Sequence, residues 1–161
     1  MKSYRDNGAI GALLDEYERT IMDLKEVIFG ITNQELSTSV DTTTKDPDCI
    51  SIQTILSHVI KAGYTYAIEI QKHFGEELSY RKNIKLENTT QYIDALDTMF
   101  AYHEMVLLKY PKLDLEEYDN DKKIIVRWGQ RYDTEQLFEH AIVHVLRHRR
   151  QIERFIVELR N

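Results

Sequence analysis

Cysteine, proline and glycine are all scarce in this chain of 161 residues. It has one cysteine, Cys49, two prolines and six glycines. A single cysteine excludes an intramolecular disulfide and fits a reducing compartment, so we expect the protein to be cytoplasmic. Few prolines and glycines favour long uninterrupted helices, because these two residues destabilise a helix interior more than any others.

Long apolar runs are absent as well, and basic residues are not in surplus. No segment approaches the roughly 20 apolar residues of a membrane span. Residues 1–10 are polar and lack the apolar core of a signal peptide. The formal net charge of −6 argues against nucleic acid as the main partner. With no repeat or Gly/Ser linker, we expect one domain over residues 1–161, bound to neither membrane nor nucleic acid.

What the chain does contain is the apolar periodicity of helices. Apolar residues recur at steps of three and four, which predicts amphipathic helices at about 8–29, 51–74, 90–110 and 134–159. Gly30, Gly75 and Pro111 would end the first three, and Asp133 or Thr134 would cap the last. Residues 122–129 are short and β-branched, which predicts a hairpin or an ordered loop. The expected fold is all-α, an antiparallel four-helix bundle.

Two histidines interrupt the apolar stripe of the last predicted helix. His144 and His148 are one turn apart, in line with Ala141 and Ile152. Two stacked imidazoles in a core cannot satisfy each other's nitrogens, whereas a metal ion can accept one nitrogen from each. The spacing alone resembles half of a zinc site without being specific, so satisfied core histidines stay open as the alternative.

Three other histidines lie on or near apolar faces. His58 is at the edge of the stripe of the second helix, where the small residues Ala62 and Gly63 allow a close approach by another helix. That helix alone favours a solvated boundary histidine. His103 lies centrally on the apolar stripe of the third helix. It could be a metal ligand, a hydrogen-bond donor to such a ligand, or a satisfied core residue. His140 lies one turn before His144, nearer the edge of its stripe.

Several other chemistries are excluded or disfavoured. No histidine has a glutamate three residues before it, as a ferritin-like di-iron site requires. There is no zincin motif, P-loop or dinucleotide fingerprint. Cys49 is close to Asp46 and Asp48, which disfavour its thiolate and make it a poor nucleophile. Arg147 and Gln151 flank the histidine stripe and would either touch a substrate or support the fold.

Two segments resemble motifs of the DinB/YfiT-like superfamily. The first is His144-Val-Leu-Arg-His148-Arg-Arg-Gln151-Ile152, similar to its last-helix motif, in which a His-x-x-x-His pair is followed by Arg and then Gln-Ile or Gln-Leu. The second is Ser51-Ile-Gln-Thr-Ile-Leu-Ser-His58-Val, similar to its second-helix motif. Arg150 stands where the family often has glycine, and this bulky cation would change what a pocket admits.

The resemblance implies a fold, a metal and a chemistry. The fold would be an antiparallel four-helix bundle with a 1-2-4-3 helix arrangement. His58, His144 and His148 would bind a divalent metal, nickel or zinc. Relatives include metal-dependent transferases that use low-molecular-weight thiols and a mycothiol-dependent isomerase, and many members have no known activity. The family has no ligand on the third helix, so His103 would lie outside the metal's ligands and find a hydrogen-bond partner.

The expected function is therefore a metal-dependent transferase that activates a low-molecular-weight thiol, or water, against a small-molecule substrate. His103, His140, Gln151 and Tyr66 are candidates for supporting the ligands or lining the substrate pocket. Two alternatives stay open: a non-catalytic metal- or small-molecule-binding stress protein, and a helical dimerisation module with core histidines. Relatives are often homodimers, and we expect one here through the outer face of the last helix, with Phe138, Ile142 and Leu146.

Overall fold

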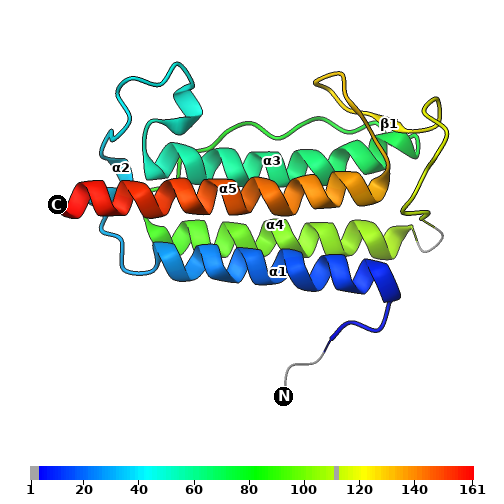
Figure 1. Cartoon of the computed structure of the whole chain (residues 1–161), viewed down its shortest axis with the longest axis horizontal. Coiled ribbons are helices and arrows are strands. Elements are labelled where there is room, and N and C mark those ends of the chain that lie inside the picture. Colours follow the sequence, from blue (N-terminus) through cyan, green and yellow to red (C-terminus); the bar gives the residue numbers. More distant parts are fainter. Residues whose placement is uncertain (1–3, 111–112) are drawn as a thin grey trace.

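The computed structural model describes residues 4–110 and 113–161 and is all-α apart from one small hairpin (Figure 1). Its four long helices are α1 (Gly8–Ile28), α3 (Ile52–His73), α4 (Thr89–Lys109) and α5 (Thr134–Arg160). The short elements are α2 (Asn33–Ser37), the 3-10 turn η1 (Pro47–Cys49), β1 (Ile124–Ile125) and β2 (Arg131–Tyr132). Every long helix agrees with its predicted range to within one residue at each end. Pro111, predicted to stop the third, lies outside the described residues.

The two helices that carry the histidine motifs both begin at a capping box. The Ser51 hydroxyl accepts the backbone N–H of Thr54 at 3.2 Å, which starts α3. The Asp133 carboxylate accepts the backbone N–H of Gln136 at 2.8 Å, which starts α5. The predicted hairpin precedes α5: β1 pairs antiparallel with β2, and Gly129 turns the chain with a φ of +87°. These caps fix where each histidine falls along its helix.

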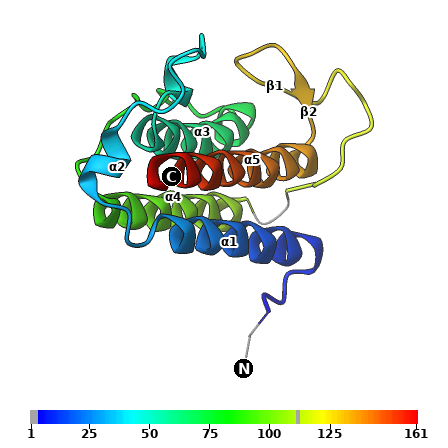
Figure 2. The ribbon, with the colours of Figure 1, turned by 60° about the vertical axis from the view of Figure 1, so that its left-hand side comes forward.

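The long helices lie side by side, each in contact with two others (Figures 1 and 2). α1 packs against α5 and α4, and α3 packs against α4 and α5. The colours of Figure 1 show that α1 and α5 run in one direction and that α3 and α4 run in the other. The expected 1-2-4-3 arrangement is therefore wrong, because it would pair α1 with α3 and α4 with α5. Neighbours are antiparallel in two pairs, α3 with α5 and α1 with α4, and parallel in the other two.

Long connections make the parallel pairs possible. Residues 74–88 return along α3 before α4 begins (Figure 1). Fifteen residues can span roughly 50 Å when extended, more than the about 33 Å length of the 22-residue α3. The backbone carbonyl of Leu86 accepts the Gln53 amide at 2.8 Å, and its N–H donates to the Tyr92 hydroxyl at 3.0 Å. These bonds fix the connection beside α3.

The core runs between all four long helices. Its fully buried side chains include Tyr17, Ile21, Leu24, Ile55, Leu56, Leu96, Met99, Leu137 and Ile152. Phe138, predicted to face outward, is instead 2% exposed, and its ring lies 5.7 Å from that of His103. The prediction failed because α5 packs between α1 and α3, so its buried arc is wider than a single stripe. Within the described residues, no helix has the length and apolar character needed to cross a membrane.

Candidate metal centre

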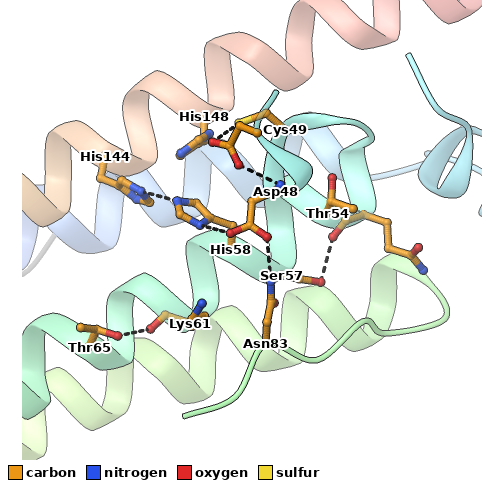
Figure 3. Close-up of polar contacts among 12 residues, drawn as sticks. Asp48, Cys49, Thr54, Ser57, His58, Lys61, Thr65, Asn83, His144 and His148 are labelled. Carbon is orange, nitrogen blue, oxygen red and sulfur yellow. Dashed lines mark hydrogen bonds and ion pairs between the residues drawn. The ribbon is translucent and has the colours of Figure 1, made fainter. Parts of the chain in front are cut away.

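Three histidines from two helices converge where α3 meets α5 (Figure 3). His58 comes from α3, and His144 and His148 come from adjacent turns of α5. One ring nitrogen from each lies within 4.8 Å of the other two. The Nε2 atoms of His58 and His144 are 3.0 Å apart, and the rings of His144 and His148 are 4.5 Å apart. The structure thus brings together the three residues that the sequence motifs singled out.

A carboxylate fixes the orientation of His58. Its Nδ1 lies 3.0 Å from Oδ2 of Asp48, and Oδ1 of Asp48 accepts the Asn83 amide at 3.1 Å (Figure 3). Because a carboxylate only accepts, Nδ1 of His58 must carry the proton. The unprotonated Nε2 then presents its lone pair to the other histidines. A histidine held by a carboxylate in this way is common among metal ligands.

His148 is held in a comparable way on its own helix. Its Nδ1 lies 3.1 Å from Oε1 of Gln151, one turn further along α5, so the amide oxygen accepts the Nδ1–H. This again leaves Nε2 unprotonated. His144 differs, because its buried Nδ1 has no hydrogen-bond partner among the described residues. Packing holds it instead, with the Tyr66 ring 5.8 Å away.

Burial favours the neutral form of the two histidines of α5, His144 and His148. Burial, together with the charges of the nearby His148 and His58, lowers the pKa of His144 to about 2. Burial also lowers the pKa of His148, followed by the charge of His58. A neutral imidazole can donate a lone pair to a metal, whereas an imidazolium cannot. The cluster is therefore ready to bind a cation at neutral pH.

A pocket of about 330 Å³ opens beside the cluster. His58 and His144 form part of its wall, and aromatic rings of Tyr66, Trp128 and His140 form another part. The Tyr66 ring lies 5.4 Å from that of His140 and 6.0 Å from that of Trp128. A small molecule in this pocket would therefore meet two of the three histidines and a largely aromatic surface.

Cations outnumber carboxylates in the lining of the two pockets beside the histidines, where the acidic residues are Asp48 and Glu139. Lys61 and Arg127 line the pocket, and Arg147 and Arg131 line a second pocket of about 430 Å³ that also reaches His140 and His144. The charge of Arg147 contributes to lowering the pKa of His140, after burial. These cations favour an anionic ligand near the cluster.

A buried glutamate holds the hairpin against this pocket. Glu69 is 3% exposed and accepts both the Tyr80 hydroxyl and the backbone N–H of Arg127 at 2.9 Å. The Arg127 guanidinium in turn lies 4.5 Å from the Tyr80 ring centroid. The sequence analysis did not identify this glutamate, because it connects α3 to two loops whose positions no periodicity reveals.

The remaining candidate residues fall in three places. His140 and Tyr66 line the pocket, and Gln151 holds His148, as described above. His103 lies outside the cluster: it is 1% exposed and its Nε2 donates to the backbone carbonyl of Gly63 at 2.8 Å. Burial lowers its pKa to about 4.

Two residues before α3 are closer to the cluster than the sequence indicated. Asp48 entered the sequence analysis only as a charge near Cys49, yet it supports His58. Cys49 itself lies close to the histidines in Figure 3. Burial raises the pKa of its thiol, and the charge of Asp46 raises it further. Cys49 is thus near the site while remaining a weak nucleophile.

No protein-family model matches the chain, and no curated protein matches it either.

Proposed function

We propose that this protein is a metalloprotein of the DinB/YfiT-like type, in which His58, His144 and His148 hold one divalent ion, nickel or zinc. The observation that supports this most is the approach of three imidazole nitrogens to within 4.8 Å of one another. The two motifs lie on α3 and α5. In this proposal the four long helices form the helix bundle of the superfamily.

The donor set suits such an ion. Imidazole nitrogens bind zinc at about 2.0–2.1 Å, which places tetrahedral ligand atoms about 3.3 Å apart. The 3.0 Å between Nε2 of His58 and Nε2 of His144 is close to this value. The contacts of Asp48 and Gln151 leave Nε2 of His58 and His148 free of protons. Neutral nitrogen donors fit zinc and nickel better than magnesium or calcium.

The proposed activity is transfer to or from a low-molecular-weight thiol, with water as the other candidate nucleophile. A divalent ion with three neutral ligands keeps an open position, where it would lower the pKa of a thiol or water. The aromatic walls of the pocket would orient the small-molecule substrate. Lys61, Arg127 and Arg147 would favour the anionic form of what binds. The thiol would come from a cosubstrate, because the pKa of Cys49 is raised.

Metal content tests the first part of the proposal. Protein purified without a histidine tag should contain about one zinc or nickel ion per chain by elemental analysis. His144→Ala should abolish this occupancy. His140→Ala is the matched control, because His140 lines the same pocket on the same helix without belonging to the cluster. Full occupancy in His144→Ala would show that the ligand set is wrong.

Removal of the metal tests whether the site is catalytic. Transfer of a small thiol to a panel of electrophiles should disappear after chelation and return on adding zinc or nickel. The melting temperature should change only modestly, because the apolar core does not depend on the ion. A large fall in melting temperature, with no transfer by the metal-loaded protein, would favour a non-catalytic metal-binding role. If the protein bound no metal and chelation changed neither its melting temperature nor any transfer, the result would favour a helical module whose histidines are core residues.

A further inference from the structure

Another cavity, on the α4 side of α3, lies between α3, α4 and the connection that joins them. It has a volume of about 530 Å³. Its apolar lining includes Ile60 and Tyr64 of α3 and Ile84 and Leu86 of the connection. The Ile84 side chain is 66% exposed, although it lies beside this apolar surface. The groove therefore presents partly buried Ile60 and Leu86 and exposed Ile84, whereas Tyr64 forms its buried floor.

Every charged residue that lines this groove is positive. Lys61, Arg81 and Lys82 line it, and no aspartate or glutamate does, although the chain has 27 acidic residues against 21 lysines and arginines. None of the three cations forms an ion pair with a carboxylate among the described residues. In an acidic protein, unneutralised cations at one groove create a local positive potential.

Arg81 is held at the groove by aromatic rings. Its guanidinium carbon lies 3.6 Å from the Tyr64 ring centroid and 5.7 Å from that of Tyr102. A cation stacked on a ring keeps its N–H donors available at its edge. Tyr64 is 5% exposed, so this support is part of the packed core. The position of the Arg81 charge is therefore fixed before any ligand arrives.

We propose that this groove binds an amphipathic anion, a small molecule with one carboxylate and an alkyl or aryl tail. The tail would lie against Ile60, Ile84 and Leu86, which removes apolar surface from water. The carboxylate would meet Arg81 and Lys82 at the rim, where charge-assisted hydrogen bonds favour it. A neutral ligand would leave the cations unpaired, and a small inorganic anion would leave the apolar lining exposed.

The groove and the histidine pocket share one residue, Lys61 of α3, one turn after His58. Binding in the groove does not require a metal, because none of the proposed metal ligands lines it. Binding should therefore be the same in chelated and metal-loaded protein. Ligand binding in the groove can therefore be tested independently of the proposed transferase activity.

Calorimetric titration with dodecanoate, below its micelle concentration, tests the proposal on the full chain. We expect saturable binding of one molecule per chain, with no measurable binding of acetate and much weaker binding of dodecanol. The double variant Arg81→Gln/Lys82→Gln should weaken dodecanoate binding roughly tenfold or more. Lys85→Gln is the matched control, since it lies on the same exposed segment but does not line the groove.

The apolar half of the site needs its own variant. Ile84→Asn should also weaken binding. Because Ile84 is exposed, we expect this variant to stay folded, and circular dichroism checks that it does. Amide shifts in NMR spectra should change in residues 57–64 and 81–86. Equal binding of dodecanol, equal effects of Lys85→Gln, or shifts confined to other segments would overturn the proposal. So would association with phosphatidylglycerol vesicles without binding of monomeric dodecanoate, which would indicate a lipid surface instead.

Discussion

Asp48 supports His58 from a turn that precedes α3, and its charge should matter for the metal. Asp48→Asn removes the negative charge of the group that accepts the Nδ1–H of His58 at 3.0 Å, and an amide oxygen is a weaker acceptor. Loss of such a partner weakens metal affinity by about 10–100-fold in comparable sites. We therefore expect a drop of that size when zinc affinity is measured by competition with a chromogenic chelator.

The control for this variant lies two residues away. Asp46→Asn makes the same change in charge, but Asp46 caps η1 by accepting the backbone N–H of Asp48 at 3.0 Å, which asparagine also does. Its zinc affinity should stay close to that of the wild type. If both variants lost affinity equally, the effect would come from general electrostatics and not from the hydrogen bond to His58.

His103 makes the stability of the fold depend on pH. Burial lowers its pKa from 6.5 to about 4, so the unfolded chain takes up a proton before the folded chain does. The contribution of neutral His103 to the free energy of unfolding is complete above pH 6.5 and is lost as the pH falls toward 4. The full difference corresponds to about 3 kcal/mol in the free energy of unfolding. Gln at position 103 cannot titrate and keeps an N–H for the carbonyl of Gly63. On acidification, the free energy of unfolding of His103→Gln should therefore fall by about 3 kcal/mol less than that of the wild type.

Urea unfolding of the metal-free protein at a series of pH values measures this difference. The other buried histidines titrate in both proteins, so subtraction isolates His103. His73→Gln makes the same substitution at an exposed histidine at the end of α3 and serves as the control. Parallel curves for wild type and His103→Gln would mean that His103 is not buried as described.

The site residues that lie on helices could be predicted from the sequence more readily than the one that lies in a loop. His144 and His148 could be predicted as a pair, because helical spacing alone places them on one face. His58 needed the family resemblance, since its own helix favoured a solvated residue. Asp48 could not be found, because its contact depends on the path of a loop.

At the scale of elements, α3 and α4 meet closely at Gly63. A Cβ atom at this position would overlap Sδ of Met99, whose side chain is fully buried. Gly63→Ala gains about 1 kcal/mol in helix propensity. Overpacking costs about 1–3 kcal/mol, so we expect a net loss of stability of about 1 kcal/mol. Thermal or urea unfolding of the variant would measure this.

A double-mutant cycle separates this overlap from other effects. Met99→Ala alone should destabilise by about 2–5 kcal/mol, because it leaves a cavity. The double variant Gly63→Ala/Met99→Ala should be more stable than the sum predicts, by about 1 kcal/mol, because the new methyl group occupies part of that cavity. Additive losses would show that the two residues are not in contact.

The helices themselves were predictable, and their arrangement was not. Apolar periodicity and capping residues are local, so the ends of α3 and α5 followed from the sequence. The parallel pairing of α3 with α4 depends on the course of residues 74–88, which carry no periodic signal. The same limit explains Phe138, since its burial depends on which helices surround α5.

At the scale of the whole molecule, four cations, Lys61, Arg81, Lys82 and Arg127, line two cavities of a chain whose net charge is −6. One cavity adjoins the histidine cluster and the other is the groove between α3 and α4. Acidic residues predominate over the chain as a whole and favour solubility. Anions should therefore be drawn to these two places more than to the rest of the surface.

The outer face of α5 carries the last prediction, a two-fold homodimer. Val143, Leu146 and Val157 are 51%, 36% and 60% exposed and share one side of α5, where the exposed Arg150 lies between the last two. Ile142 is partly buried, and Phe138 belongs to the core. Exposed apolar residues in a stripe favour a subunit interface, because association removes them from water. We therefore propose that two copies of α5 pack across a two-fold axis.

Sedimentation velocity at micromolar concentration should show a dimer, and Leu146→Glu should convert it to a monomer, because the charge would be buried without a partner. Leu108→Glu is the control: Leu108 is 82% exposed on α4, so the same charge placed there should leave the dimer intact. A wild-type protein that sediments only as a monomer would contradict the prediction. Dissociation by Leu108→Glu but not by Leu146→Glu would place the interface on α4, because a charge disrupts only the surface that association buries.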